Sequence, residues 1–290
     1  MLSRFLNIWG ATGEKYAYRY MVKSDRWNER WHNSLIDVLT HRKKGGNAMV
    51  IVGAGHSLNT LTKDEIRFFE SMDSIGVNFA AFNEHLKPKE CLMELDEVRH
   101  ERSAIMSTMI KKGNGNQRFY LNLLHARRIP DVTTQLLELD NVFCFDVVRF
   151  RTLKKWWFKM NALIYLKFTY RFFRRPIHHG ASIVMALTIG LMRGYREIHL
   201  VGVDLNGGQY FYEHPDYERS QLKGLMEMDR AVMQRATKGI HPTQDPAIAV
   251  GFGELAIGDT VPFIVSLLQK QGTRIFVRGE DSGFHKYLRM

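Results

Sequence analysis

Short apolar runs alternate with amphipathic and charged segments along the chain, and this alternation predicts buried strands separated by helices. We expect strands over residues 48–52, 74–78, 117–122, 141–148, 198–203 and 273–278. Strands that alternate with helices indicate an α/β protein with a single doubly wound, mainly parallel sheet of Rossmann-like type.

The clearest pattern lies between residues 180 and 212. A helical apolar run from Ile183 to Met192 follows Ser182, and Gly194 is placed to end that helix. A nearly continuous apolar strand comes next and closes on Asp204. In α/β folds, ligands bind at the carboxyl ends of strands, near helix N-termini. Ser182 and Asp204 are therefore candidates for a ligand site.

The first predicted strand runs into a glycine loop that contains Gly53, Gly55 and Ser57. Glycines after a strand let the backbone approach a phosphate or ribose closely. A capping-box pattern at Thr62 and Glu65 places the next helix about four residues past the loop. The third glycine of the dinucleotide fingerprint is missing, so NAD is weakly supported. A nucleotide-sized ligand and a plain tight turn both remain open.

Asparagines end two of the predicted strands, at Asn78 and Asn122. An amide there can hydrogen-bond a base or a sugar, although an asparagine turn explains each residue equally well. Residues 87–112, which separate them, are charged, and we predict a helix there.

The 290 residues can bury a full core, and we divide them into an N-terminal helical extension at 1–46 and an α/β domain at 47–290. Two cysteines in apolar surroundings form no disulfide framework or metal cluster, which favours a reducing compartment. We recognise no signal peptide and no run of about 18 apolar residues. The net charge of +11 favours nucleotides, acidic sugars, nucleic acid or anionic lipid, or else serves solubility.

Residues 149–175 contain nine Lys or Arg, no acidic residue and many aromatic rings. Such a mixture is typical of a membrane interface, where aromatic rings anchor and cations meet anionic lipid. A helix with core aromatics and solvated cations is the alternative, and nucleic acid is the least favoured partner.

Motifs for a Walker loop, a nucleophile elbow and a zinc protease are absent from the sequence, as is an Asp-x-Asp pair, so we predict no metal ligands. His241, in a loop beyond the aromatic segment, can accept a proton near neutral pH, and His178 and His179 compete with it. Tyr210 and Tyr212 could donate hydrogen bonds to a departing phosphate.

The chain resembles bacterial glycosyltransferase family 42, the sialyltransferases, and a related uncharacterised group with the same glycine loop. The likeness is carried by residues 50–58, by residues 182–204 and by Ile240-His241-Pro242. It implies a GT-A variant of the α/β fold, with a lid at about 205–240. Ala54 and His56 depart from the family's loop, and Asn206 stands where a tyrosine is expected.

The resemblance also implies roles for individual residues. Ser182 would bind the carboxylate of the donor sugar, and His241 would be the general base of an inverting displacement. Tyr210 or Tyr212 would stabilise the leaving phosphate. The nucleotide and donor site would comprise Gly53, Gly55, Ser57, Asn78, Asn122, Gly180, Ser182 and Asp204.

The implied reaction moves an acidic sugar, sialic acid or a relative such as ketodeoxyoctulosonate, from a CMP-sugar to a surface glycan or glycolipid, as in lipopolysaccharide biosynthesis. The resemblance implies no required metal cofactor, although a divalent ion is compatible with it. It places the enzyme in the cytoplasm, peripheral on the inner face of the membrane, and is compatible with a homo-oligomer. Nucleic acid is not among the expected partners. A phosphate-transferring, pyrophosphokinase-like enzyme and a non-enzymatic nucleotide-binding module are the alternatives.

Overall fold

The computed structural model describes residues 46–95, 100–112, 116–126, 129–150, 152–169, 175–205, 210–217, 222–224, 244, 246, 249 and 255–288. The predicted N-terminal extension, apart from Gly46, lies outside these residues, as do His241 and most of the predicted lid.

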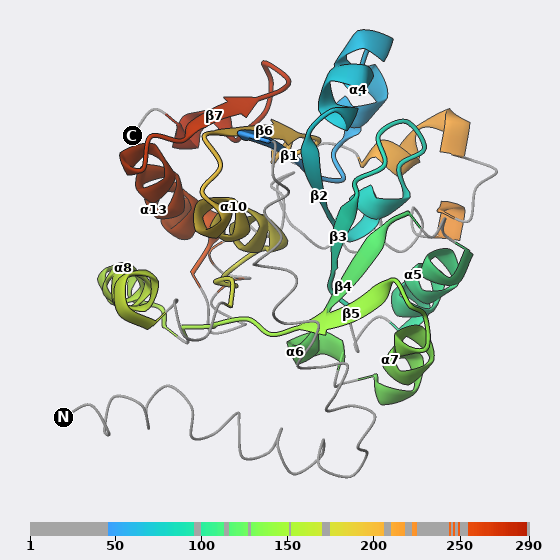
Figure 1. Cartoon of the computed structure of the whole chain (residues 1–290), viewed down its shortest axis with the longest axis horizontal. Coiled ribbons are helices and arrows are strands. Elements are labelled where there is room, and N and C mark those ends of the chain that lie inside the picture. The colour runs from blue at the N-terminus through green and yellow to red at the C-terminus, as the bar shows by residue number, and fades with distance from the viewer. Residues whose placement is uncertain are drawn as a thin grey trace.

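Seven strands form one parallel sheet in the order β5-β4-β3-β2-β1-β6-β7 (Figure 1). The strands are β1 Ala48–Val52, β2 Asp73–Val77, β3 Glu90–Met93, β4 Arg118–Asn122, β5 Val142–Phe145, β6 Glu197–Val201 and β7 Arg274–Val277. The chain builds outward from β1 to β5 and then returns to the other side of β1 at β6. The switch point, where ligands bind in such sheets, is therefore at the carboxyl ends of β1 and β6. The predicted doubly wound, mainly parallel sheet is confirmed.

Helices cover both faces of the sheet (Figure 1). One face carries α8 Lys155–Ile164, α10 Ser182–Arg193 and α13 Ile257–Lys270, and the other carries α4 Lys63–Glu70, α5 His100–Lys112 and α7 Pro130–Leu137. The short helix α6 Leu123–Ala126 directly follows β4. Each helical layer forms a separate hydrophobic cluster with the face of the sheet that it covers.

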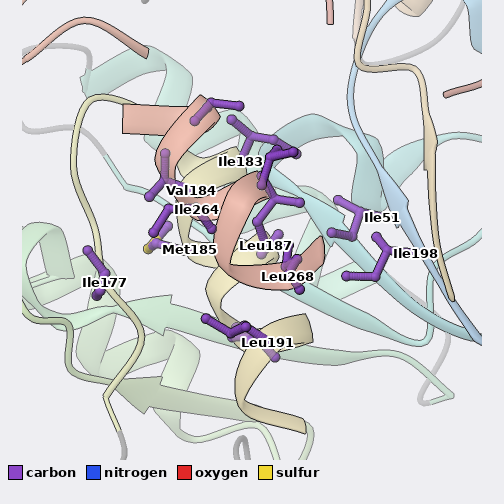
Figure 2. Packing of buried hydrophobic residues seen from close by; sticks show 14 of the residues in the cluster. Ile51, Ile177, Ile183, Val184, Met185, Leu187, Leu191, Ile198, Ile264 and Leu268 are labelled. Atoms are coloured by element: carbon purple, nitrogen blue, oxygen red, sulfur yellow. The ribbon is translucent and has the colours of Figure 1, made fainter. Parts of the chain in front are cut away.

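Helix α10 is the central helix of its layer and is buried along nearly its whole length. Its apolar side chains pack between the sheet and α13, and Figure 2 shows Leu187 of α10 near Leu268 of α13 and near Ile51 and Ile198 of the sheet. A helix enclosed on several sides needs apolar residues all round, which explains its continuous apolar sequence. Gly194 ends it in the left-handed conformation (φ 68°), as predicted. This packing fixes the N-terminus of α10 at the carboxyl edge of the sheet.

Most of the predicted elements are confirmed, including the capping box in which Thr62 and Glu65 exchange hydrogen bonds at the start of α4. The prediction that residues 87–112 form a helix was wrong in its first part, because β3 lies there and α5 begins at His100. Pairing with β2 and β4 on either side overrides the charged surroundings of this four-residue strand.

Candidate active site at the carboxyl edge of the sheet

The loops that follow β1 and β6 meet at the switch point of the sheet. Gly53 N–H donates to the Val201 carbonyl (2.8 Å), and Gly55 N–H donates to the Gly202 carbonyl (2.7 Å). A Cβ atom on Gly53 would lie 2.3 Å from the Gly202 oxygen, and one on Gly55 would lie 2.3 Å from Asp204 Oδ2. Both glycines are therefore required by the close approach of the two loops.

Asp204 holds the glycine loop from the β6 side. Its carboxylate accepts hydrogen bonds from Ser57 N–H (3.0 Å) and from the Ser57 hydroxyl (2.5 Å). The Asp204 carbonyl also accepts from Gly283 N–H (2.6 Å), which ties the C-terminal segment to the same point. The structure thus brings together four predicted residues, Gly53, Gly55, Ser57 and Asp204, and gives Asp204 a role in shaping the loop.

A second polar group lies at the ends of β2 and β3, at the N-terminus of α10. Asn78, with a positive φ of 51°, donates from Nδ2 to Ser182 Oγ (3.0 Å) and accepts from Glu94 N–H through Oδ1 (2.9 Å). The Ser182 hydroxyl in turn donates to Glu94 Oε2 through a short hydrogen bond. The predicted residues Asn78 and Ser182 are therefore in direct contact, and a carboxylate that the sequence did not reveal links them.

Two histidines complete this group, which we call the Glu94 cluster: Asn78, Glu94, His125, His178 and Ser182. His178 Nε2 lies 2.7 Å from Glu94 Oε1, and the His125 and His178 ring centroids are 6.2 Å apart. Ligand atoms of Glu94, His125 and His178 all lie within 4.8 Å of one another. Two imidazoles and a carboxylate at this spacing can hold a metal ion or relay a proton.

The Glu94 carboxylate is stabilised in its charged form. Burial alone would raise the pKa of Glu94, but the charges of His178 and His125 and the hydrogen bonds from His178 and Ser182 lower it below its usual range. Glu94 is therefore an anion that faces the N-terminus of α10.

His178 and His179, which competed as candidate bases, have separate environments. His179 stacks on Phe158 (4.8 Å between centroids) and accepts a hydrogen bond from Leu255 N–H at Nε2 (3.0 Å). Burial, together with the charges of His178 and Arg149, lowers the pKa of His179 to about 3. His179 is therefore a neutral core residue, whereas His178 belongs to the polar cluster.

Gly180 and Asn122, two further predicted site residues, lie in tightly packed surroundings. Gly180 has a φ of 78°, and a Cβ atom there would lie 2.7 Å from the Leu255 carbonyl oxygen, so the turn into α10 requires glycine. Asn122 is fully buried, and its Nδ2 lies 3.8 Å from Met185 Sδ. Contact between Asn122 and a ligand would therefore require the surrounding residues to move.

The predicted tyrosines flank the glycine loop. Tyr210 forms an antiparallel bridge with Gly55 and stacks on Tyr212, with ring centroids 5.1 Å apart. Tyr212 is fully buried and packs edge-on against Phe79. Tyr210, which is only partly buried, is the better placed of the two to reach a ligand. His241 lies outside the described residues.

Glu94 and His125 are the site residues that sequence reasoning missed. Each follows a strand end, as Glu94 comes directly after β3 and His125 lies three residues after the end of β4. The rule that had selected Asn78 and Asn122 would have found Glu94 if β3 had been recognised.

No protein-family model matches the chain, and no curated protein sequence matches it. Among solved structures it is similar to the monofunctional alpha-2,3-sialyltransferase Cst-I from Campylobacter jejuni, at 16% identity and a TM-score of 0.44, over 85% of this chain and 81% of that chain. It is also similar to the sialyltransferase CstII from Campylobacter jejuni in complex with the substrate analogue cytidine-5'-monophosphate, at 14% identity and a TM-score of 0.40, over 83% of both chains. A third is CST-II with a trisaccharide acceptor and CMP, at 15% identity and a TM-score of 0.43, over 83% of this chain and 84% of that chain. At this level of similarity, the function has to be argued from the chain's own residues.

Proposed function

We propose that the protein is an inverting glycosyltransferase that moves an acidic sugar from a CMP-sugar donor to a glycan or glycolipid acceptor. One observation carries the proposal. The glycine loop and the polar N-terminus of α10 lie at the ends of neighbouring strands around the switch point of a parallel sheet. A nucleotide and the sugar attached to it need two such adjoining sites.

The nucleotide would lie against the glycine loop. The close approach of Gly53 and Gly55 to the β6 loop and the Ser57–Asp204 hydrogen bonds hold the glycine loop in one shape. Tyr210, which pairs with Gly55, would donate a hydrogen bond to the departing phosphate.

The acidic sugar would lie at the N-terminus of α10. A helix N-terminus favours an anion because its first backbone N–H groups point outward and the helix dipole is positive there. Ser182 and Asn78 would orient the sugar carboxylate. His241 would take the proton from the acceptor hydroxyl, which attacks the anomeric carbon while the bond to CMP breaks.

A glycolipid acceptor would require contact with a membrane surface, and α8 offers a matching face. Trp156 is 60% exposed, and Phe168, in the π-helical turn η3 Tyr165–Thr169 that continues α8, is 62% exposed. Lysines 154, 155, 159 and 167 accompany these rings. Within the described residues, no helix is both long enough and apolar enough to cross a membrane. Bound through the exposed rings and lysines of this face, the enzyme would act as a peripheral protein on the inner face of the cell membrane.

The direct test is release of CMP from CMP-sialic acid and from CMP-ketodeoxyoctulosonate, with wild-type protein, His241→Ala and the control His199→Gln. His199 lies in the middle of β6, away from the candidate site, so its variant should retain turnover. Loss of turnover in His241→Ala, with an unchanged melting temperature, would support the general base. Retained turnover in that variant would overturn the assignment.

A thermal-shift screen of CMP, ADP, UDP, NAD and S-adenosylmethionine would test the nucleotide class. Stabilisation by CMP is expected. Strict magnesium dependence with ATP and no response to CMP would replace the proposal with a phosphate-transferring enzyme. Stabilisation by CMP without turnover of any donor would indicate a binding module.

A further inference from the structure

We propose that Glu94, His125 and His178 bind a divalent transition-metal ion of the zinc type. The residues come from three distant segments of the chain, namely the end of β3, helix α6 and the turn that leads into α10. No sequence motif connects them, and they become neighbours only because their segments meet at the carboxyl edge of the sheet.

The geometry of the three side chains fits such an ion. Their ligand atoms all lie within 4.8 Å of one another, and His178 Nε2 is 2.7 Å from Glu94 Oε1. Zn²⁺ binds imidazole nitrogen and carboxylate oxygen at about 2.0–2.2 Å, which sets tetrahedral ligand atoms about 3.4 Å apart. On binding, the His178–Glu94 pair would therefore open slightly, and ligand atoms that lie farther apart would draw together. His178 is 7% exposed, and its Nδ1 atom is buried without a hydrogen-bond partner among the described residues. The His178 ring is therefore held inside the cluster, with Nε2 directed at Glu94.

The carboxylate is already oriented as metal-binding carboxylates are. One oxygen, Oε1, faces His178, whereas the other, Oε2, accepts the Ser182 hydroxyl and lies 3.4 Å from Asn78 Nδ2. Hydrogen bonds of this kind fix the direction of a metal ligand and are characteristic of metal sites. Ser182 and Asn78 would therefore be positioning residues for the ion.

The donor set selects the class of ion. Two imidazoles with one carboxylate suit zinc and related transition metals, whereas Mg²⁺ and Ca²⁺ prefer oxygen ligands. Three protein ligands also leave a coordination position open, as in zinc sites that bind a substrate or a water molecule. Glu94 is 17% exposed at its side chain, so the cluster is not sealed from solvent.

A metal ion would also resolve a conflict of charge, and this part of the inference rests on the proposed function. The Glu94 anion contacts Ser182, which is where the carboxylate of an acidic sugar would bind. Two like charges repel each other there. A divalent ion on Glu94 would reverse the local charge and leave a coordination position for the sugar carboxylate.

The test uses the untagged full chain without nucleotide. After chelation and dialysis it is titrated with Zn²⁺, with Co²⁺, whose visible absorption reports its ligands, and with Mg²⁺. One Zn²⁺ or Co²⁺ per chain is expected, with much weaker binding of Mg²⁺. Glu94→Gln and His178→Gln should lose the site, and Ser182→Ala should weaken it by about 10–100-fold. The control His199→Gln, in which a histidine that also lies near a carboxylate is replaced, should bind as the wild type does.

Absence of saturable Zn²⁺ binding by the wild type would overturn the inference, as would equal binding by Glu94→Gln. Melting curves of each variant without metal separate loss of the site from loss of the fold. If Zn²⁺ binds but no CMP-sugar is turned over, the proposed function fails and the metal site stands. If CMP-sugar is turned over by a chain that binds no Zn²⁺, the metal site fails alone.

Discussion

Gly55 lies so close to Asp204 that no side chain fits between them, and Gly53 is equally close to the Gly202 carbonyl. The sequence suggested that these glycines make room for a phosphate or form a tight turn. At the residue scale, the packing of the β1 loop on the β6 loop already requires them. Their presence alone therefore says less about a ligand than the motif implies.

The first prediction concerns Gly55→Ala. Its methyl group would lie 2.3 Å from Asp204 Oδ2 and would push that carboxylate away from Ser57. Overpacking of this kind costs about 1–3 kcal/mol, which should appear as a lower midpoint of urea unfolding. The matched control is Gly258→Ala in α13, where the new atom would meet nothing closer than 3.7 Å, so stability should hold or rise. Equal midpoints for wild type and Gly55→Ala would contradict the argument.

The second prediction concerns the pH dependence of stability. The folded-state pKa of His179 is lowered to about 3, mainly by burial, whereas an unfolded histidine titrates near 6.5. Between those values the unfolded chain binds a proton that the folded chain does not, so stability is lost as the pH falls from about 6.5 towards 3. The loss has an upper limit of about 1.4 kcal/mol per pH unit.

His179→Gln keeps a hydrogen-bond acceptor for Leu255 N–H but cannot titrate. Its unfolding free energy, measured by urea titration from pH 7 to pH 4.5, should fall less steeply than that of the wild type. Parallel slopes for the two proteins would show that His179 does not carry this dependence.

At the element scale, β3 and the end of α10 are joined by a buried ion pair. Arg193 Nη2 lies 2.8 Å from Glu90 Oε2, and the Arg193 side chain is almost fully buried. The pair joins β3, which could not be predicted from the sequence, to α10, which was the clearest prediction. Glu94 lies four residues further along the chain, directly after the end of β3.

The third prediction tests that pair. Arg193→Met leaves the Glu90 carboxylate buried without its main counter-charge, so the protein should lose about 3–5 kcal/mol of stability. The double variant Arg193→Met/Glu90→Met removes both charges and should recover much of that loss. A double-mutant cycle from urea unfolding measures the coupling between the two residues. Additive losses would mean that the pair is not coupled in the folded protein.

Elements with a long or uniform apolar pattern could be predicted from the sequence, and α10, β1 and β6 are examples. The short strand β3 could not, because its place between β2 and β4 decides its conformation and its own residues do not. The same limit applied to the site. Asn78 and Ser182 were found from strand and helix ends, but Glu94 and His125 join them only through the sheet order, which the sequence pattern did not supply.

At the scale of the whole molecule, the two faces of the sheet differ in what they present. Helix α8, with the π-helical turn that follows it, lies on the α10 face and carries exposed aromatic rings among lysines, with Lys167 5.4 Å from the Phe168 ring. Helix α4 lies on the opposite face (Figure 1). It also exposes one large ring, Phe68 (51%), but beside both acidic and basic residues. A surface that bound anionic lipid would use the first face and not the second.

The fourth prediction compares those faces. The double variant Trp156→Gln/Phe168→Gln should bind vesicles of phosphatidylglycerol and phosphatidylcholine at least about tenfold more weakly than the wild type, because each buried ring contributes about 1.5–3 kcal/mol. Phe68→Gln, which removes a similarly exposed ring from α4, should bind like the wild type. Binding by the wild type and by Phe68→Gln should weaken with added salt, because salt screens the attraction between the lysines and the anionic lipid. Vesicle sedimentation measures binding by all three proteins.

Equal losses in the two variants would mean that exposed rings in general, and not the α8 face, carry the binding. If the double variant retained full binding, the attraction would come from net charge alone, and a glycolipid acceptor would lose its structural support.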